Sequence, residues 1–258
     1  MPFKHYIRKA DQRGEYWEGQ TFEEYLSLCD SQLTTELLLD YLPHEGPILE
    51  AGCGLARWVI FLRGKGFNVV GLDASQHALQ TARRHASTIP LINADILHMP
   101  FGNNVFAAIL SFGVVEHFER DMQATFQEMR RVLRKRGLLF LAVPYTNLLR
   151  RTLVHPYILL KNTSRKMRGV ELVFDEYTHS RAELRRLLVQ NGFEPLKIVP
   201  DDLRLPYAMG LCRDFRNRLG DPQKFTLNRM GVLIATALNK LSPWIACGGV
   251  FCVARRVK

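Results

Sequence analysis

The stretch ILEAGCGLARW, residues 48–58, decides the fold class of this 258-residue chain. An apolar run of strand length ends in two glycines, Gly52 and Gly54, and a segment with helical spacing follows them directly. Such a turn lets the backbone approach a ligand closely and is typical of nucleotide-binding α/β proteins. The alternative is that the glycines only form the turn between a strand and a helix and bind no ligand. The rest of the sequence has to distinguish the two roles.

The rest of the chain continues this alternation of strands and helices. Strands are expected over residues 47–50, 68–72, 91–93, 105–111, 138–143, 194–200 and 249–256. Helices are expected over 57–65, 75–86 and 122–133, the last running on to a stop at Gly137, and over a segment opened by Ser180. The alternation predicts a doubly wound α/β fold, with a mostly parallel sheet covered by helices on both faces.

Two segments interrupt the alternation, and they divide the predicted single domain. We expect an N-terminal helical arm (1–45), a cofactor-binding core (46–146), a first insertion (147–178), the rest of the core (179–202 and 247–258) and a second insertion (203–246). Insertions on an α/β core tend to lie at the carboxyl ends of strands. The two insertions are therefore expected to form a lid over the substrate site.

The net charge of +10 is concentrated in one part of the chain. Between Glu128 and Glu171 all eleven charged residues are Arg or Lys. Such a block suits an anionic partner, whether nucleic acid, a phospholipid surface or a phosphorylated substrate, although a solvated basic face would have the same composition. Five cysteines without CxxC spacing, no signal-peptide pattern and no apolar run of membrane-spanning length predict a cytoplasmic protein.

The ligand of the glycine turn can be narrowed from the sequence. The dinucleotide pattern G-x-G-x-x-G fails, because Arg57 stands where the third glycine is needed. The second strand ends in Asp73, whose carboxylate can accept both hydroxyls of a ribose. Asp95 follows the third strand, next to the apolar Ile96, and suits an adenine ring. Together with Glu50, these acids at three successive strand ends favour an adenosyl ligand.

At this point the chain resembles the class I S-adenosylmethionine-dependent methyltransferases, and within them the type 11-like group that acts on small molecules and lipids. The matching segments are EAGCGLAR, GLDAS, NADILHMPF, FAAILSFGVVEHF and EMRRVLRKRGLLFLAVP. The resemblance implies seven strands, with the last strand antiparallel to the others. One departure is Ala56, where the family commonly has glycine.

The resemblance also implies a cofactor, S-adenosylmethionine, and its product S-adenosylhomocysteine. Glu50, Gly52 and Gly54 would hold the methionine part, Asp73 the ribose, and Asp95 with Ile96 the adenine. Ser111 and Phe112 would lie beside the sulfonium. The full set of expected cofactor contacts is Glu50, Gly52, Cys53, Gly54, Asp73, Ala74, Asp95, Ile96, Ser111 and Phe112. Tyr16 and Trp17 look like an aromatic pair that covers the cofactor, or else they pack as ordinary core residues.

Methyl transfer from a sulfonium is an in-line displacement, so positioning can supply most of the catalysis. A general base is needed only when the acceptor must lose a proton of high pKa. His117 is the candidate base, with a structural pocket histidine as the alternative, and Glu116, Tyr145 and His179 are the candidate substrate residues. No His, Cys or Asp cluster has metal-ligand spacing, so we expect no metal.

The sequence says less about the methyl acceptor than about the methyl donor. The segment SFGVV replaces the proline-rich motif of nucleobase amino methyltransferases, and the paired-glutamate loop of protein-arginine enzymes is absent. The insertions mix aliphatic and basic residues, which is the composition of interfacial segments. We therefore expect a small-molecule or lipid-linked acceptor, with peripheral contact at the inner, anionic membrane face as a hypothesis and an ordinary lid as its alternative.

Other functions and the oligomeric state stay open. The basic block also fits an RNA or protein methyltransferase, or an RNA-binding or scaffold protein that keeps the fold, although nucleic acid is the less favoured partner. A nicotinamide-dependent oxidoreductase is disfavoured, because the third glycine and a Tyr-x-x-x-Lys site are missing.

Overall fold

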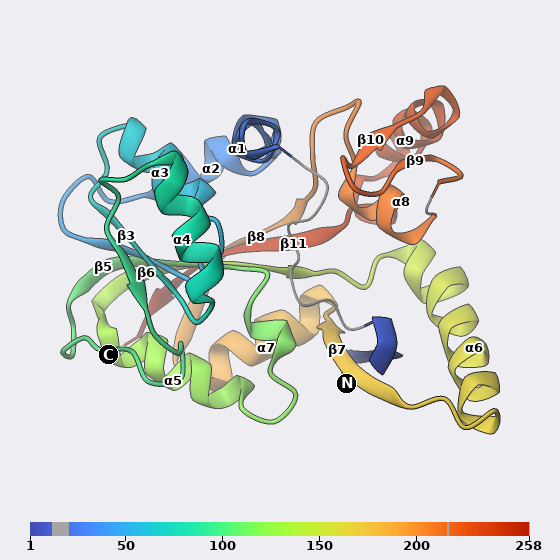
Figure 1. Ribbon diagram of the computed structural model, residues 1–258, viewed down its shortest axis with the longest axis horizontal. Helices are drawn as coiled ribbons and strands as arrows, with labels where there is room; N and C mark the ends of the chain where they lie inside the picture. Colours follow the sequence, from blue (N-terminus) through green and yellow to red (C-terminus); the bar gives the residue numbers. More distant parts are fainter. Residues whose placement is uncertain (12–20, 216, 258) are drawn as a thin grey trace.

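A seven-stranded sheet forms the centre of the computed structural model, which describes residues 1–11, 21–215 and 217–257 (Figure 1). Its strand order is β4-β3-β2-β5-β6-β11-β8. The strands are β2 (Ile48–Ala51), β3 (Val69–Asp73), β4 (Leu91–Asn93), β5 (Phe106–Phe112), β6 (Leu133–Pro144), β8 (Phe193–Asp201) and β11 (Gly249–Arg256). β11 lies antiparallel between β6 and β8, and the other pairs are parallel. The predicted doubly wound sheet with an antiparallel last strand is confirmed.

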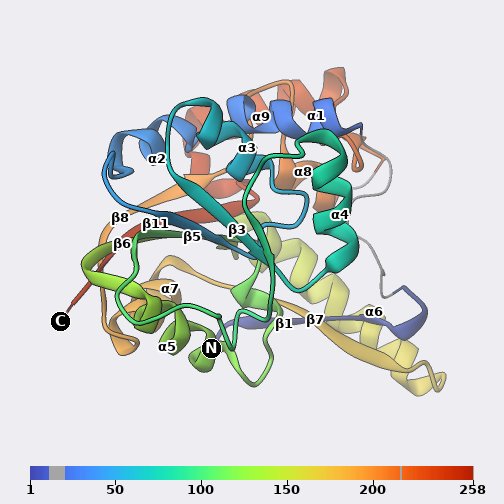
Figure 2. The same ribbon diagram turned by 60° about the vertical axis from the view of Figure 1, so that its left-hand side comes forward.

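Helices cover both faces of this sheet (Figure 2). Helices α1 (Phe22–Ser31), α2 (Thr35–Tyr41), α3 (Arg57–Gly64) and α4 (Gln76–His85) pack on one face, and α5 (Met122–Val132) and α7 (Arg181–Gln190) pack on the other. Neighbouring strand residues point to opposite faces. Thus Ile48 packs with Trp58 of α3, while Leu49 packs with Phe126 of α5. Parallel strands buried on both sides explain why their sequences are almost wholly apolar.

The helix starts follow the capping signals in the sequence. The Ser180 hydroxyl accepts from the Glu183 amide, and the Glu183 carboxylate accepts from the Ser180 amide, which is a capping box at the start of α7. The expected end of α5 at Gly137 is wrong, because α5 ends at Val132 and the basic segment opens β6. Leu133 is buried opposite Phe106 of β5, so this tertiary contact overrides the helical spacing.

The N-terminal residues form a strand, so the helical arm expected over 1–45 is wrong at its start. β1 (Phe3–Arg8) pairs antiparallel with β7 (Leu172–Thr178) of the first insertion and is followed by η1 (Lys9–Asp11). The Phe3 ring stacks on His155 with 3.7 Å between ring centroids. The partner that makes residues 3–8 a strand lies far away in the sequence, and only α1 and α2 are helical as expected.

The two insertions lie at one end of the molecule (Figure 1). The first contains η3 (Arg150–Val154), α6 (His155–Met167) and β7. The second contains α8 (Met209–Asp214), β9 (Gly220–Asp221), β10 (Thr226–Leu227), α9 (Arg229–Leu241) and η4 (Pro243–Ile245), around a small apolar cluster of its own. A buried ion pair joins them, with 2.7 Å between Arg150 Nε and Asp214 Oδ2. Within the described ranges, no helix has the length and apolar character required to cross a membrane.

Candidate active site

The glycine turn joins β2 to α3 through three residues with left-handed backbone. Gly52 has φ 82°, Gly54 has φ 51° and Ala56, the residue before α3, has φ 61°. A Cβ on Gly52 would lie 2.4 Å from Cγ2 of Val114, so this position has no room for a side chain. Ala56 adopts the same unfavourable conformation with its methyl group buried, which explains why glycine is common at this position in the family that the sequence resembles.

Asp73 lies beside the turn, at the carboxyl end of β3, as the sequence predicts. Its Oδ2 accepts a hydrogen bond from the amide of Gly54 at 2.7 Å, and its Oδ1 accepts from the amide of Ser75 at 2.8 Å. Each carboxylate oxygen has a second lone pair for a ligand hydroxyl. The neighbouring Ala74 is exposed, and its carbonyl oxygen accepts from the side-chain amide of Asn93 at 3.0 Å.

Glu50 and Cys53 are buried against the sheet. Oε2 of Glu50 accepts from the amide of Val59 at 3.0 Å, so this carboxylate caps the first turn of α3. Burial raises the pKa of Glu50 to about 8, although Arg57 opposes the rise. The Cys53 sulfur lies 2.8 Å from where a Cβ on Gly71 would be, and burial raises the pKa of this thiol. The Cys53 side chain thus fills the core beneath the turn.

The end of β4 carries the two residues expected at the adenine. Asp95 is exposed, and its Oδ1 accepts from the amide of Leu97 at 2.9 Å, which fixes the loop. Ile96 is buried in the same apolar cluster as Leu72 and Met99. Asp73 and Asp95 thus stand at the carboxyl ends of adjacent strands, whereas the side chain of Ile96 belongs largely to the core.

At the end of β5, Ser111 and Phe112 differ in their surroundings. The Ser111 hydroxyl is fully buried and has no hydrogen-bond partner among the described residues. The Phe112 ring packs edge-on against Trp58, with 5.7 Å between the ring centroids. Phe112 therefore links the end of β5 to the first turn of α3, next to the glycine turn.

Arg57 is a site residue that we did not predict from the sequence. Its guanidinium lies over the rings of Tyr25 and Trp58, at 5.0 and 5.6 Å from their centroids. In the part of the chain that the structure describes, this half-buried guanidinium makes no hydrogen bond or ion pair. Its donors are therefore available to an anionic ligand group. Its place directly after the glycine turn, at the first residue of α3, is the signal that would have identified it.

Glu116 and His117 lie on η2 (Val115–His117), just beyond β5. Glu116 is only 2% exposed, and its Oε2 has no hydrogen-bond partner among the described residues. Burial raises the pKa of Glu116 to about 7, although His117 opposes the rise. An unpaired buried carboxylate oxygen is costly unless a ligand satisfies it. Glu116 is therefore the side chain in this region that most clearly requires a hydrogen-bond donor from a ligand.

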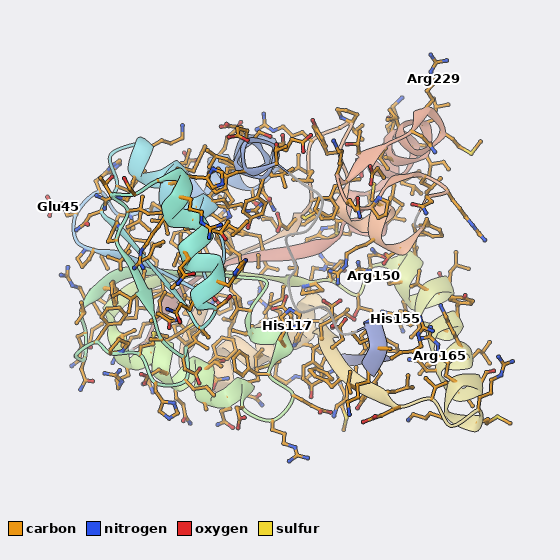
Figure 3. All side chains as sticks on the ribbon, in the orientation of Figure 1. Glu45, His117, Arg150, His155, Arg165 and Arg229 are labelled. Carbon is orange, nitrogen blue, oxygen red and sulfur yellow. The ribbon has the colours of Figure 1, made fainter. Side chains whose placement is uncertain are left out.

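His117 is exposed near β1 and β7 (Figure 3). Its Nδ1 donates a hydrogen bond to the carbonyl oxygen of Asp175 at 2.7 Å, which leaves Nε2 as the nitrogen that can accept a proton. Desolvation lowers the pKa of His117, but Glu116 and the Asp175 carbonyl together raise it above the ordinary value. The bond to β7 orients the ring, as a structural histidine or an oriented base would require.

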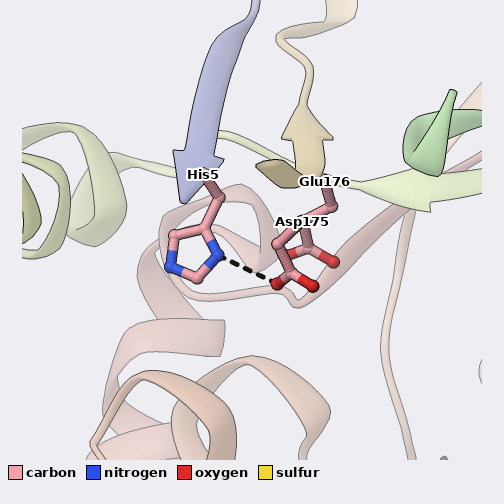
Figure 4. A group of neighbouring side chains, drawn as sticks. All are labelled: His5, Asp175 and Glu176. Carbon is pink, nitrogen blue, oxygen red and sulfur yellow. Dashed lines mark hydrogen bonds and ion pairs between the residues drawn. The ribbon is translucent and has the colours of Figure 1, made fainter. Parts of the chain in front are cut away.

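Charged residues from the N-terminal strand and both insertions surround η2. Glu176 of β7 binds Arg213 of α8 with both oxygens, each at 2.9 Å. Asp175 pairs with His5 of β1 at 3.1 Å (Figure 4). Ligand-type atoms of His5, Asp175 and Glu176 lie within 4.8 Å of one another, a grouping that sequence spacing did not indicate. Because Arg213 occupies both Glu176 oxygens, this group forms the Glu176–Arg213 ion pair and the His5–Asp175 hydrogen bond in the structure.

Tyr145 and His179 adjoin each other across an isolated bridge between the ends of β6 and β7. Tyr145 packs on Trp244, with 5.1 Å between ring centroids, and burial raises its pKa. His179 is 2% exposed, burial lowers its pKa to about 4, and its Nδ1 has no hydrogen-bond partner among the described residues. His179 is therefore neutral near pH 7. Tyr16 and Trp17 lie outside the described residues.

A groove of about 410 Å³ lies between β1 and α6, away from the glycine turn. Phe3, Leu159 and Lys166 are among its lining residues. The N-terminal segment and the first insertion line it together, and none of the strand-end residues described above is among its lining residues.

Comparisons with known proteins agree with this geometry. A family model described as a methyltransferase domain matches residues 48–137. An uncharacterized protein of Methanocaldococcus jannaschii is 31% identical over an alignment of 133 residues, and the match covers 49% of this chain and 57% of that protein. The demethylmenaquinone methyltransferase of Staphylococcus haemolyticus is 32% identical over an alignment of 98 residues, and the match covers 35% of this chain and 40% of that protein. The chain spans about half the length of the curated relatives it matches.

One solved structure extends the likeness to most of the chain. The geranyl diphosphate C-methyltransferase from Streptomyces coelicolor, solved in complex with Mg²⁺, geranyl diphosphate and S-adenosylhomocysteine, has a TM-score of 0.57 and 18% sequence identity. The likeness covers 86% of this chain and 76% of that protein. At this level of identity it supports the fold, which agrees with the strand order found here.

Proposed function

We propose, on the premise that residues 48–137 form a class I S-adenosylmethionine-dependent methyltransferase domain, that this protein transfers a methyl group from S-adenosylmethionine to a small-molecule or lipid-linked acceptor. The observation that carries the proposal is the hydrogen bond between Asp73 and the Gly54 amide. It holds a carboxylate beside the glycine turn, at the carboxyl ends of β3 and β2. Asp95 stands at the end of the next strand along this edge. This is the arrangement that an adenosyl ligand requires.

The residues present fit S-adenosylmethionine. Asp73 offers lone pairs to the ribose hydroxyls, and Asp95 offers a carboxylate to the exocyclic amine of the adenine. Arg57 offers its guanidinium, which makes no hydrogen bond or ion pair within the described residues, to the carboxylate of the methionine part. The cofactor supplies an activated methyl group when bound. The similar Streptomyces coelicolor enzyme was crystallised with S-adenosylhomocysteine, which supports this assignment.

Glu116 is the residue that we assign to the acceptor side. Its Oε2, which has no hydrogen-bond partner among the described residues, belongs to a residue two positions after Val114, and Val114 packs against the glycine turn. A carboxylate there can accept a hydrogen bond from the molecule to be methylated and take its proton during methyl transfer. His117 is the second candidate for this role, through Nε2, the ring nitrogen that does not bind the Asp175 carbonyl oxygen. We assign the exclusion of water to Ser111 and Phe112, which end β5 shortly before these two residues in the chain.

The acceptor class is the finer part of the proposal. Geranyl diphosphate, which the Streptomyces coelicolor enzyme binds, joins an apolar chain to an anionic group. An acceptor of this kind requires apolar and basic residues in its binding site, and the insertions of this chain contain both. An amphiphilic acceptor of this kind is also one that a protein meets at a membrane surface.

Calorimetry with S-adenosylmethionine and S-adenosylhomocysteine tests the cofactor assignment. We expect dissociation constants of about 1 μM to 1 mM for the wild-type protein. Asp73→Ala should weaken the binding of both ligands at least about tenfold, because it removes a charged hydrogen-bond acceptor. The control is Asp40→Ala, since Asp40 is an exposed aspartate on α2. Absence of binding to the wild-type protein, with its fold verified by circular dichroism, would overturn the proposal.

A further inference from the structure

Helix α6 of the first insertion and the η3 segment that leads into it expose a row of large apolar side chains. Leu153, Tyr157, Leu160 and Met167, here named the α6 row, are between 57% and 83% exposed. Their spacing of four, three and seven residues places them on one side of the helix. Scattered single apolar residues are ordinary on a protein surface, but an aligned row of this length marks an interaction surface.

Basic side chains border the α6 row. Lys161 and Arg168 are exposed, and each follows a member of the row by one position. The Lys161 ammonium lies 5.5 Å from the centre of the Tyr157 ring, at the edge of the row. No Asp or Glu occurs anywhere in residues 129–170. The partner that fits this surface is therefore apolar in the middle and anionic at the border.

Helix α9 of the second insertion repeats the pattern independently. Met230, Leu233 and Leu241 are between 63% and 78% exposed, at helical spacing. Arg229 and Lys240 are exposed beside them, and Figure 3 shows Arg229 pointing outward from the end of α9. Helices α6 and α9 lie at the same end of the molecule (Figure 1).

The base of the first insertion is fixed to the rest of the protein. Arg150 is buried, pairs with Asp214 and donates to the carbonyl oxygens of Tyr145 and Gly248 at 3.0 Å. His155 lies at the start of α6 (Figure 3) and is buried. Its ring stacks on Phe3. Arg150 is thus unable to reach a lipid headgroup, although it contributes to the basic composition of this insertion.

We infer that α6 and α9 dock the protein on the surface of an anionic phospholipid bilayer. The α6 row enters the boundary between headgroups and acyl chains, and Lys161 and Arg168 bind the headgroups. A nucleic acid is the less fitting partner, because the phosphate backbone offers nothing to four aliphatic or aromatic side chains set in one row. The inference is independent of the proposed methyl transfer, since no residue of the α6 row belongs to the strand-end site.

Sedimentation with vesicles tests the inference on the full chain. Vesicles of phosphatidylcholine with 30% phosphatidylglycerol should carry the protein down, more weakly as salt rises, and pure phosphatidylcholine vesicles should not. Lys161→Glu/Arg168→Glu should lower partitioning at least about tenfold. The matched control is Lys135→Glu/Arg136→Glu, which changes the net charge equally at the other end of β6 and should lower partitioning less.

A site-specific label provides a second measurement. The five native cysteines are all buried, so an introduced surface cysteine can be labelled selectively. An environment-sensitive fluorophore on Leu160→Cys should shift to shorter wavelength when anionic vesicles are added. The same fluorophore on Val189→Cys, an exposed apolar position on α7, should not shift.

The possible results are distinct. Failure of the wild-type protein to sediment with anionic vesicles would overturn the inference, as would equal losses in the two charge-reversal pairs. Binding to a homopolymer RNA in place of vesicles would overturn it in favour of a nucleic acid. Calorimetry with S-adenosylmethionine on the same variants should be unchanged, which separates membrane docking from the proposed enzyme function.

Discussion

The carboxylate of Asp73 accepts a hydrogen bond from the amide of Gly54 at 2.7 Å, across the gap between the ends of β3 and β2. The second oxygen of the same carboxylate holds the amide of Ser75 at the start of α4. One side chain thus fixes both turns that a ligand at this edge must contact. Because the turns are already ordered, binding does not have to supply the free energy of ordering them.

Gly52→Ala should disturb this turn. The new Cβ would lie 2.4 Å from Cγ2 of Val114, at a φ of 82° that alanine rarely adopts. We expect the free energy of unfolding to fall by about 2 to 4 kcal/mol in urea titrations. Adding Val114→Ala should recover the steric part of the loss. Gly64→Ala is the control, since no described residue outside its own helix lies within 4 Å of the added Cβ, and it should not destabilise the protein. Similar losses at both glycines would contradict this account.

Arg57→Met should weaken binding of the methionine part of the cofactor while leaving most of the stem that packs on Tyr25 and Trp58. We expect the affinity for S-adenosylmethionine in calorimetry to fall about 10- to 100-fold, the effect of losing a hydrogen bond to a charged group. The affinity for 5′-methylthioadenosine, which lacks the amino-acid part, should change little. Arg84→Ala, at an exposed arginine on α4, is the control. An equal loss for both ligands would count against the assignment.

The strands and the glycine turn could be predicted because their signals are local. The bounds expected for β4 and β11 match the structure, since turn residues and apolar runs mark them directly. The positions of Asp73 and Asp95 followed from the same logic, because the carboxyl ends of parallel strands meet at one edge.

The remaining features depend on contacts that are distant in the sequence. β1 is a strand only because β7 pairs with it. Whether a basic residue faces solvent is equally non-local, since Arg150 is buried by Asp214 of the other insertion while Arg151 beside it is exposed. The unpaired oxygen of Glu116 likewise becomes visible only once its neighbours are placed.

Glu116 should make stability depend on pH. Its pKa of about 7 in the folded protein exceeds the ordinary value of 4.5, so folding retains a proton that the unfolded chain releases. The contribution of this proton to the free energy of unfolding is fully present below about pH 4.5 and is lost as the pH rises through about 7. Glu116→Gln cannot ionise and should escape the loss.

Relative to wild type, the free energy of unfolding of Glu116→Gln should therefore rise between pH 5 and pH 8, by up to about 3 kcal/mol. Urea titrations at the two pH values measure this difference. Glu23→Gln, at an exposed glutamate of α1, should show no comparable change. A Glu116→Gln protein whose stability follows pH as the wild type does would refute the role of this carboxylate.

The ion pair between Arg150 and Asp214 should hold the two insertions together. Asp214→Ala would leave a buried guanidinium whose remaining acceptors are the carbonyl oxygens of Tyr145 and Gly248. Breaking a buried pair by removing one partner costs about 3 to 5 kcal/mol. We expect a loss of this size in urea titrations, and faster amide hydrogen exchange in α6 and α8. The control is Glu171→Ala, which removes an exposed pair with Lys9 and should cost less than about 1 kcal/mol. Equal costs for the two substitutions would mean that the Arg150 pair does not fasten the insertions to each other.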